Sequence, residues 1–405
     1  INGVARTRLG AVSVSSGALT AWAPTADFTV QSLGLTQAED RVIVSGGFSA
    51  INGVAAPSFT SLDAVTGEVY PFAVNQVINN SAINADSGQG AGVTSIKVVG
   101  NSVFATGWSY YRGNFEGMVK VDAYTGQIQN LMECRGDTYD AVPFKGLIYT
   151  VSHHHRCDGI GGFPQATPWT FQHSDAVTEQ VTGQVQLNFP GQPAGSYVNW
   201  FPTWRPAPAG TGSNAQQAGW STEASGDYLA IGGEFLMING IAQQGLVRFG
   251  THAVAGASTS TPAAPAAEMV PTLRNISETS TRLSVKSQWD RDNMTLTTNI
   301  FRLDVSTTVP VHSFTGESTF WNRPVLSWVD TGLTTGQTYT YRVQFVDADG
   351  NKRTSAEVSI VAGTNVPPSS DYSNQVFADG ALNYWRLDDA VGATTAVDWS
   401  SGNDL

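Results

Sequence analysis

The sequence has little charge, few lysines and almost no cysteine. Charged residues make up 13% of its 405 residues, five residues are lysine, and the net charge is −12. Such a chain offers no basic patch that would displace counterions from phosphates, so nucleic acids and anionic membranes are not expected as partners. No run of about 18 apolar residues occurs, so we also expect no membrane-spanning helix.

The short motifs of common catalytic sites are missing as well. The sequence contains no serine elbow, phosphate-binding loop, dinucleotide fingerprint or zinc-protease helix. Three carboxylates near repeat loops, Asp137, Asp140 and Glu234, are candidates for a glycosidase pair, but the sequence does not fix their separation. The repeat pattern by itself explains Glu234. We therefore expect no catalytic site in this part of the chain.

Glycine is abundant, with 42 copies, and some of these recur in one context. A Thr-Gly pair follows an apolar, strand-like segment at Gly67, Gly126 and Gly183, and Gly17 lies in a looser copy. The copies recur at intervals of roughly 50 to 60 residues, which indicates a repeat architecture. Glycine suits a tight turn because it adopts positive φ without a Cβ clash. Each copy is therefore predicted to be a β-hairpin, and a series of such units is typical of propeller blades.

A longer signature accompanies the turns. Gly46-Gly47-Phe48 is followed by Ile51-Asn52-Gly53, and Gly232-Gly233-Glu234-Phe235 is followed by Ile238-Asn239-Gly240. The paired glycines let the chain turn or let two backbones approach closely. Ile1-Asn2-Gly3 falls inside another copy, so we expect the chain to be a fragment of a longer protein.

This signature carries a resemblance. Together with the segments 134–139 and 153–165, it resembles the propeller repeats of large secreted multidomain proteins of actinobacteria. The resemblance implies a β-propeller over residues 1–252, truncated at its N-terminus, with about five visible blades. It also implies an extracellular, secreted or cell-wall associated protein.

A different pattern follows the repeats. Residues 253–270 are small, polar and rich in proline, which predicts a linker. Residues 271–363 contain short alternating segments typical of a β-sandwich. Within them, the segment 333–339 resembles the tyrosine corner of a fibronectin type III domain. The resemblance implies that Tyr339 hydrogen-bonds to upstream backbone and that Trp289 is the core tryptophan.

The last part of the chain is short. Residues 364–370 form a second expected linker. Motifs within 382–388 and 398–403 then resemble the opening of a laminin-G-like, concanavalin-type jelly roll, of which 371–405 would be the beginning. So short a segment cannot bury a core alone, so it must lean on its neighbours if it is ordered. The predicted fold class is all-β: a β-propeller, a fibronectin type III β-sandwich and a truncated jelly-roll segment.

The two cysteines are Cys134 and Cys157. They are either buried free thiols or a disulfide, and their polar, turn-rich surroundings favour the disulfide. Closing a loop of this length stabilises a fold by about 3 kcal/mol. Two cysteines at this spacing are not a zinc pattern. The disulfide predicts an oxidising, extracellular compartment.

Two segments have the residue types of metal sites. His153 and His155 share one face of a strand, so they are candidate zinc or copper ligands, with His173 or Asp158 as a third. The alternative is that these histidines make hydrogen bonds around the disulfide.

The second segment is Asp347-Ala348-Asp349-Gly350-Asn351. Asp347, Asp349 and Asn351 have the alternation of a calcium loop, but the glutamate expected further on is absent. An ordinary hairpin turn explains the same residues.

Aromatic residues replace the usual glycine and phenylalanine of the repeat at Trp108, Tyr110 and Tyr111. Exposed aromatic rings stack on sugars, so these three residues are candidate ligand-binding residues. Comparable tryptophans are Trp169, Trp200, Trp204 and Trp220. The alternative is that they pack in the core or between blades.

Taken together, the patterns predict a non-catalytic secreted or cell-surface protein. Its partner would be a polysaccharide or a protein on an extracellular surface, and its role adhesion or scaffolding. Two other functions stay open: an accessory region of an extracellular glycan-active enzyme, and a phage tail or fibre component. The sequence establishes no cofactor, and the candidates that it suggests are a calcium ion and a zinc or copper ion.

Overall fold

The computed structural model describes residues 1–82, 89–208, 217–366, 370–379, 381, 383–389 and 391–400. Within these residues the chain is strands and turns, with two short α-helices, α1 (His252–Ala255) and α2 (Asp371–Ala378). The sheets are built from antiparallel pairs, so the predicted all-β class is confirmed. The chain divides into two compact units, Ile1–Gly256 and Ala257–Leu405.

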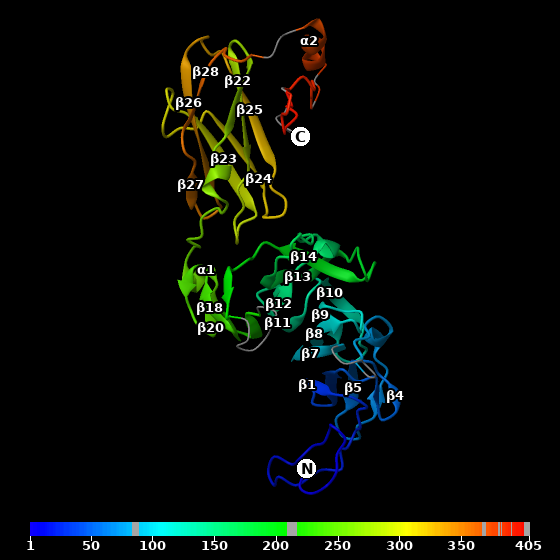
Figure 1. Cartoon of the computed structure of the whole chain (residues 1–405). Coiled ribbons are helices and arrows are strands. Elements are labelled where there is room, and N and C mark those ends of the chain that lie inside the picture. The colour runs from blue at the N-terminus through cyan, green and yellow to red at the C-terminus, as the bar shows by residue number, and fades with distance from the viewer. Residues whose placement is uncertain are drawn as a thin grey trace. The chain divides into compact units, whose positions relative to one another are not determined.

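The first unit is a series of small sheets (Figure 1). The first sheet contains β1 (Val30–Leu35), β2 (Arg41–Gly46), β5 (Phe59–Asp63) and β6 (Val69–Tyr70), and the hairpin β3 (Ala50–Ile51) and β4 (Val54–Ala55) lies between β2 and β5 in the sequence. The second contains β7 (Gly90–Val99), β8 (Ser102–Tyr110), β9 (Gly117–Asp122) and β10 (Ile128–Glu133).

The third sheet contains β11 (Thr138–Phe144), β12 (Leu147–His154), β13 (Gln172–Gln184) and β14 (Pro193–Val198). Two three-stranded sheets follow: β16 (Gly219–Ser225), β17 (Tyr228–Gly233) and β20 (Leu246–Gly250), and β15 (Trp204–Pro206), β18 (Phe235–Ile238) and β19 (Ile241–Ala242). Two 3-10 turns are also present, η1 (Ala73–Gln76) and η2 (Asp158–Ile160).

Successive sheets contact one another through their first strands. β1 lies against β7, β7 against β11, and β11 against β16. Asp140 on β11 accepts hydrogen bonds from Ser95 Oγ (2.7 Å) and Thr222 N (2.9 Å). It also forms an ion pair with Lys97 Nζ at 2.8 Å. Asp140 is buried and joins three sheets, so its carboxylate is not available to a substrate.

The three Ile-Asn-Gly segments have the same local backbone geometry. Their asparagines have φ angles of 50°, 51° and 52°, and the glycines that follow have 77°, 76° and 78°. Asn52 Oδ1 accepts a hydrogen bond from Thr25 N, and Asn239 Oδ1 accepts one from Thr203 N, both at 2.8 Å. The three copies therefore fold into the same turn, and the copies at Asn52 and Asn239 also share the same anchor.

The paired glycines permit close backbone approach. A Cβ at Gly46 would overlap the carbonyl oxygen of Thr29, and a Cβ at Gly233 would overlap that of Ala218. Equivalent positions of two copies thus need glycine for the same reason.

The Thr-Gly turns are confirmed in two copies. Gly67 (φ 78°) lies between β5 and β6, and Gly126 (φ 70°) lies between β9 and β10. The turn predicted at Gly183 is wrong, because this residue lies within β13. The register between β13 and β14 shifts twice, and the turn falls instead between Asn188 (φ 55°) and Gly191 (φ 85°).

The second unit contains a β-sandwich. One sheet has β21 (Thr272–Ser277), β22 (Ser280–Lys286) and β25 (Val325–Thr331), and the other has β23 (Thr295–Arg302), β24 (His312–Glu317), β26 (Thr338–Val346), β27 (Lys352–Thr354) and β28 (Val358–Val361). Side chains alternate along β26, so Tyr341, Val343 and Phe345 face inward and meet Leu283 of the other sheet in one core.

The geometry implied for Tyr339 is present: its hydroxyl accepts a hydrogen bond from Thr334 N at 2.8 Å. The role expected for Trp289 is wrong. Trp289 lies beyond the end of β22, where its backbone bonds with Ala263 and its ring contacts Phe320. Trp328 on β25 packs against the core instead.

The segments expected as linkers and tail have structure of their own. The unit boundary falls after Gly256, and residues 257–270 pack on the second unit, where η3 (Ala266–Met269) places Met269 in the core. In the tail, Arg282 donates to the carbonyl of Asp398, and Arg274 lies over the Trp399 ring. The tail therefore leans on the sandwich, while the motif residues Leu382 and 401–403 lie outside the described residues.

Candidate functional site

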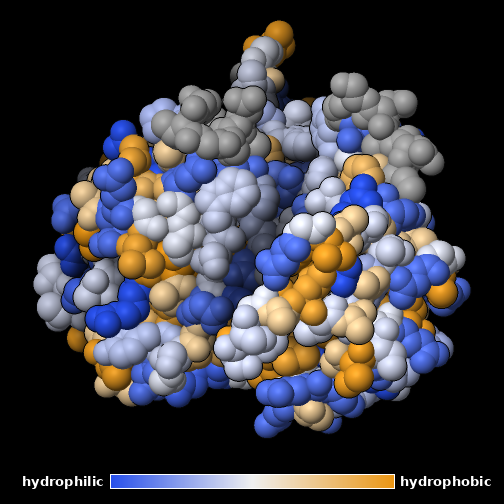
Figure 2. All heavy atoms as spheres, turned by 90° about the horizontal axis from the view of Figure 1, so that it is seen from below, coloured by the Kyte–Doolittle hydropathy of each residue, from blue (hydrophilic) through white to orange (hydrophobic). Residues whose placement is uncertain are grey.

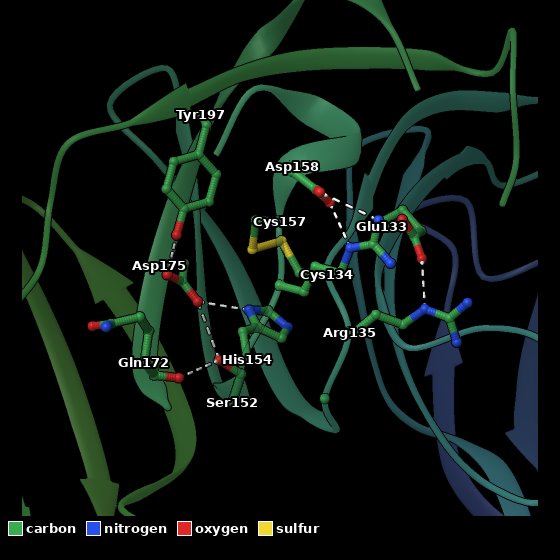
Figure 3. Close-up of a disulfide and its surroundings, with 12 residues drawn as sticks. Glu133, Cys134, Arg135, Ser152, His154, Cys157, Asp158, Gln172, Asp175 and Tyr197 are labelled. Atoms are coloured by element: carbon green, nitrogen blue, oxygen red, sulfur yellow. Dashed lines mark hydrogen bonds and ion pairs between the residues drawn. A yellow bond between two sulfur atoms is a disulfide. The ribbon is translucent and has the colours of Figure 1, made fainter. Parts of the chain in front are cut away.

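The predicted disulfide between Cys134 and Cys157 is confirmed. Cys134 follows β10 and Cys157 precedes η2, and both are fully buried. A backbone bridge between Arg135 and Arg156 lies beside the bond. The disulfide therefore fastens the segment after β12 to the segment that enters β11 (Figure 3).

Beside the disulfide lies a set of polar side chains that we call the sealed cluster: Thr138, Ser152, His154, Asp175 and Tyr197. Figure 3 labels the last four of these residues. Thr138 Oγ1 lies 2.7 Å from His154 Nε2, and His154 Nδ1 lies 2.6 Å from Asp175 Oδ2. The Tyr197 hydroxyl donates to Asp175 Oδ1, and Ser152 Oγ donates to Oδ2.

A hydroxyl, an imidazole and a carboxylate in this order have the connectivity of a catalytic triad. However, Thr138, His154 and Asp175 have no exposed surface. A substrate has no access to them, so the sealed cluster is structural.

An open pocket of about 930 Å³ lies in the same unit, and we call it the aromatic pocket. Three parts of the chain line this pocket: β8 with the loop after it, the segment before β11, and β12 with the loop after it. The lining residues are Ser109, Tyr110, Tyr111, Glu116, Arg135, Gly136, Asp137, His153, His155, Arg156, Gln165, Trp169 and Phe171. Two smaller pockets, of about 190 and 270 Å³, are lined by other residues.

The walls of the aromatic pocket are exposed rings. Tyr110, Tyr111 and Trp169 are 56%, 79% and 54% exposed. The two tyrosine rings meet edge to face at 4.5 Å, and Trp169 stacks on His155 at 4.1 Å, which fixes its orientation. Figure 2 shows one face of the molecule, where hydrophobic side chains lie in small groups between hydrophilic ones. Scattered apolar residues are ordinary, so aromatic rings gathered at one pocket are the more informative feature.

Two carboxylates also line this pocket. Glu116 Oε2 accepts a hydrogen bond from Gly136 N at 3.2 Å, and the Asp137 carboxylate accepts one from the Ser109 backbone. Burial raises the pKa of Glu116, and the negative charge of Asp137 raises it further. Burial likewise raises the pKa of Asp137, while nearby His153 lowers it.

The histidines of the pocket are engaged in hydrogen bonds or ring contacts. Asp137 N donates to His153 Nε2 at 3.3 Å, so the neutral ring carries its proton on Nδ1. That nitrogen lies 2.9 Å from Gln217 Oε1 and 2.7 Å from the Tyr139 hydroxyl. Burial lowers the pKa of His153, and lowers that of His155 to about 4. Both rings are therefore neutral at pH 7.

The predicted zinc site has no third ligand in the described part of the chain. In that part, the group of three potential metal ligands that lie close enough to share an ion is Cys134, His154 and Cys157. The two cysteines of this group form the disulfide with each other. Asp158, one proposed third ligand, pairs with Arg156 at 2.8 Å. The geometry favours the alternative, in which the histidines form hydrogen bonds next to the disulfide.

The predicted calcium loop is a hairpin turn between β26 and β27. Asp347 Oδ1 and Oδ2 accept hydrogen bonds from Asn351 N (2.8 Å) and Nδ2 (2.9 Å), and Asp349 accepts one from Asn293. Asp290 is close enough to this turn for the charge of Asp347 to act on it: burial, then a hydrogen bond with Asp292, and also the charge of Asp347 raise the pKa of Asp290 to about 7. The calcium interpretation stays a prediction, and the turn explains the residues without an ion.

The remaining sequence candidates lie elsewhere. Trp108 lines the pocket of about 270 Å³, where a Cβ at Gly90 would overlap its ring. Trp200 and Trp204 pack in hydrophobic clusters, and Trp220 contacts Tyr139. Sequence reasoning missed the two pocket residues Glu116 and Phe171, and no local motif marks either residue.

The chain was compared with protein-family models and with curated proteins. No protein-family model matches it, and no curated protein gives a significant match. Among the described residues, no helix has the length and apolar character needed to cross a membrane.

Proposed function

We propose that this chain belongs to a secreted or cell-surface multidomain protein and binds a carbohydrate in the aromatic pocket. The supporting observation is the exposed aromatic wall of Tyr110, Tyr111 and Trp169 beside hydrogen-bonding side chains. Flat rings at the mouth of a concave site offer faces for sugar stacking, and a few polar groups orient the ligand.

The order of modules supports an extracellular role. The repeats resemble propeller blades, and the segment 271–363 resembles a fibronectin type III domain. The tail, 371–405, resembles the start of a laminin-G-like domain. In the families that these modules resemble, they serve adhesion and carbohydrate binding. The disulfide agrees with an oxidising compartment.

Glycan-array binding followed by calorimetry tests this proposal. Trp169→Ala and Tyr110→Ala are each expected to lower affinity for the selected glycan about fivefold or more, because one ring contact is worth about 1 kcal/mol. Tyr372→Ala, which removes an even more exposed ring in the second unit, serves as the control. The proposal would be contradicted if no glycan on the array binds, or if both pocket variants bind the selected glycan as tightly as the wild-type protein does.

A glycan-cleaving activity is the second candidate, because Glu116 and Asp137 share the pocket. Most glycoside hydrolases use two carboxylic groups that flank the scissile bond, one as general acid and the other as general base or nucleophile. Release of new reducing ends from the bound glycan, abolished by Glu116→Gln, would establish it. Binding without release would leave the protein a lectin-like module.

A further inference from the structure

Backbone hydrogen bonds hold the two carboxylates that line the aromatic pocket. In the part of the chain that the structure describes, Glu116 and Asp137 accept hydrogen bonds from backbone N–H groups, and neither forms an ion pair. Both are partly buried, so water screens their charges less than it would at an open surface. A buried carboxylate without a cation is costly unless something neutralises it.

The arginines that line the pocket are already paired. Arg156 Nε and its terminal nitrogen bind the two carboxylate oxygens of Asp158 at 2.8 and 3.2 Å. Arg135 Nε lies 3.5 Å from Glu133, and its terminal nitrogen donates to Asn188 at 2.8 Å. These guanidinium groups therefore bind carboxylates outside the pocket lining, although the charge of Arg135 also lowers the pKa of Glu116. Within the described residues, the acceptor oxygens of Glu116 and Asp137 are not held by a guanidinium group.

The histidines supply no positive charge either. His153 has both ring nitrogens in hydrogen bonds, and its neutral form suits them. His155 is 8% exposed and lines the pocket, and its Nδ1 has no hydrogen-bond partner among the described residues. A neutral imidazole nitrogen can accept a proton donor. The pocket thus combines carboxylate acceptors, a spare imidazole nitrogen and aromatic faces.

We propose that the aromatic pocket recognises its glycan through a protonated amine, so that the ligand is an amino sugar with a free ammonium group. This inference rests on the proposed carbohydrate binding and names its ligand class. An ammonium donates up to three hydrogen bonds, which matches Glu116 and Asp137 as acceptors. Aromatic faces attract a cation as well as a sugar ring. An N-acetylated sugar carries no such charge and leaves the carboxylates without a counter-charge.

Calorimetry with three oligosaccharides of one length tests the proposal: a glucosamine oligomer, its N-acetylated form and a glucose oligomer. The titrations use near-neutral buffer, in which the pocket carboxylates are ionised, the pocket histidines are neutral and part of the amine is protonated. The glucosamine oligomer is expected to bind about tenfold tighter than either other sugar, and to weaken as salt is added. Equal affinity for all three sugars would overturn amine recognition. This comparison uses the wild-type protein, so it does not depend on the folding of a variant.

Isosteric variants locate the effect. Glu116→Gln and Asp137→Asn are each expected to reduce affinity for the glucosamine oligomer about tenfold to hundredfold, since each removes a charged acceptor. Affinity for the N-acetylated oligomer should change little. Glu278→Gln, an exposed carboxylate of the second unit, is the control. Unchanged binding in both pocket variants would overturn the assignment.

The outcomes separate this inference from the proposed function. If all three sugars bind alike and Trp169→Ala weakens them all, carbohydrate binding stands and amine recognition fails. If none of the three sugars binds, amine recognition fails, and carbohydrate binding fails as well if no glycan on the array binds.

Discussion

The sealed cluster and the aromatic pocket use neighbouring residues in opposite ways. His154 has no exposed surface, and its two nitrogens contact Thr138 and Asp175. His153 and His155 lie on either side of it in sequence and line the open pocket. Because side chains alternate along a strand, the end of β12 contributes to both regions. The difference teaches that residue type alone does not mark a binding site; access from solvent and groups without partners do.

The largest expected loss of stability comes from a change in the sealed cluster. Asp175→Ala removes the acceptor for His154, Ser152 and Tyr197 and leaves these polar groups buried without it. Removing one member of such a buried network costs about 3–5 kcal/mol of unfolding free energy. Guanidinium unfolding of the first unit should show this loss. Asp227→Asn, which removes a surface ion pair with Lys145, is the control and should leave the denaturant midpoint of unfolding unchanged. A midpoint unchanged by Asp175→Ala would mean that the network is not structural.

The disulfide should contribute slightly less to the unfolding free energy than the sealed cluster does. Replacing Cys134 and Cys157 together by alanine frees the loop that they close and should lower the unfolding free energy by about 3 kcal/mol. Reductant added to the wild-type protein should reproduce the shift. If reduced and oxidised protein unfold at the same denaturant concentration, the bond does not stabilise the fold.

Stability should fall in acid because of the buried histidine His173. Burial lowers its pKa to about 4, below the ordinary value of 6.5. Between these two values the unfolded chain binds a proton that the folded chain does not, so stability declines as the pH falls from 6.5 towards 4. The loss approaches about 3 kcal/mol. Unfolding measured across this range should show it, and His173→Gln should reduce the slope. An equal slope in the variant would refute the assignment.

The smallest effect on stability is expected in the aromatic pocket. Trp169 is 54% exposed, so Trp169→Ala should change the unfolding free energy by no more than about 0.5 kcal/mol while it weakens glycan binding. Paired thermal unfolding and calorimetry would check both halves. A large loss of stability would place Trp169 with the structural residues and remove the contrast between the two regions.

Local patterns predicted the parts of the fold that depend on neighbours in sequence. Glycine turns at Gly67 and Gly126 follow from backbone sterics, and the hydrogen bond of Tyr339 spans only five residues. Local patterns failed where the pairing between strands determines the position of a residue. Gly183 lies inside β13 because the register with β14 shifts, and Trp289 lies past the strand that would have carried it into the core.

The candidate site was predicted only in pieces. Exposed aromatic residues were expected at Tyr110 and Tyr111, and histidines at His153 and His155, but as separate ligand and metal sites. They line one pocket because the loop after β8 meets the end of β12. Glu116 was missed, since nothing in its sequence neighbourhood distinguishes a pocket carboxylate from a solvated one.

A crystal structure with a bound glucosamine oligomer tests the central claim most directly. We expect a sugar ring against Trp169 or Tyr110, with its ammonium within hydrogen-bond distance of Glu116 or Asp137. The sealed cluster should be unchanged in the complex. A sugar bound elsewhere on the protein, with the aromatic pocket empty at saturating ligand, would contradict the account.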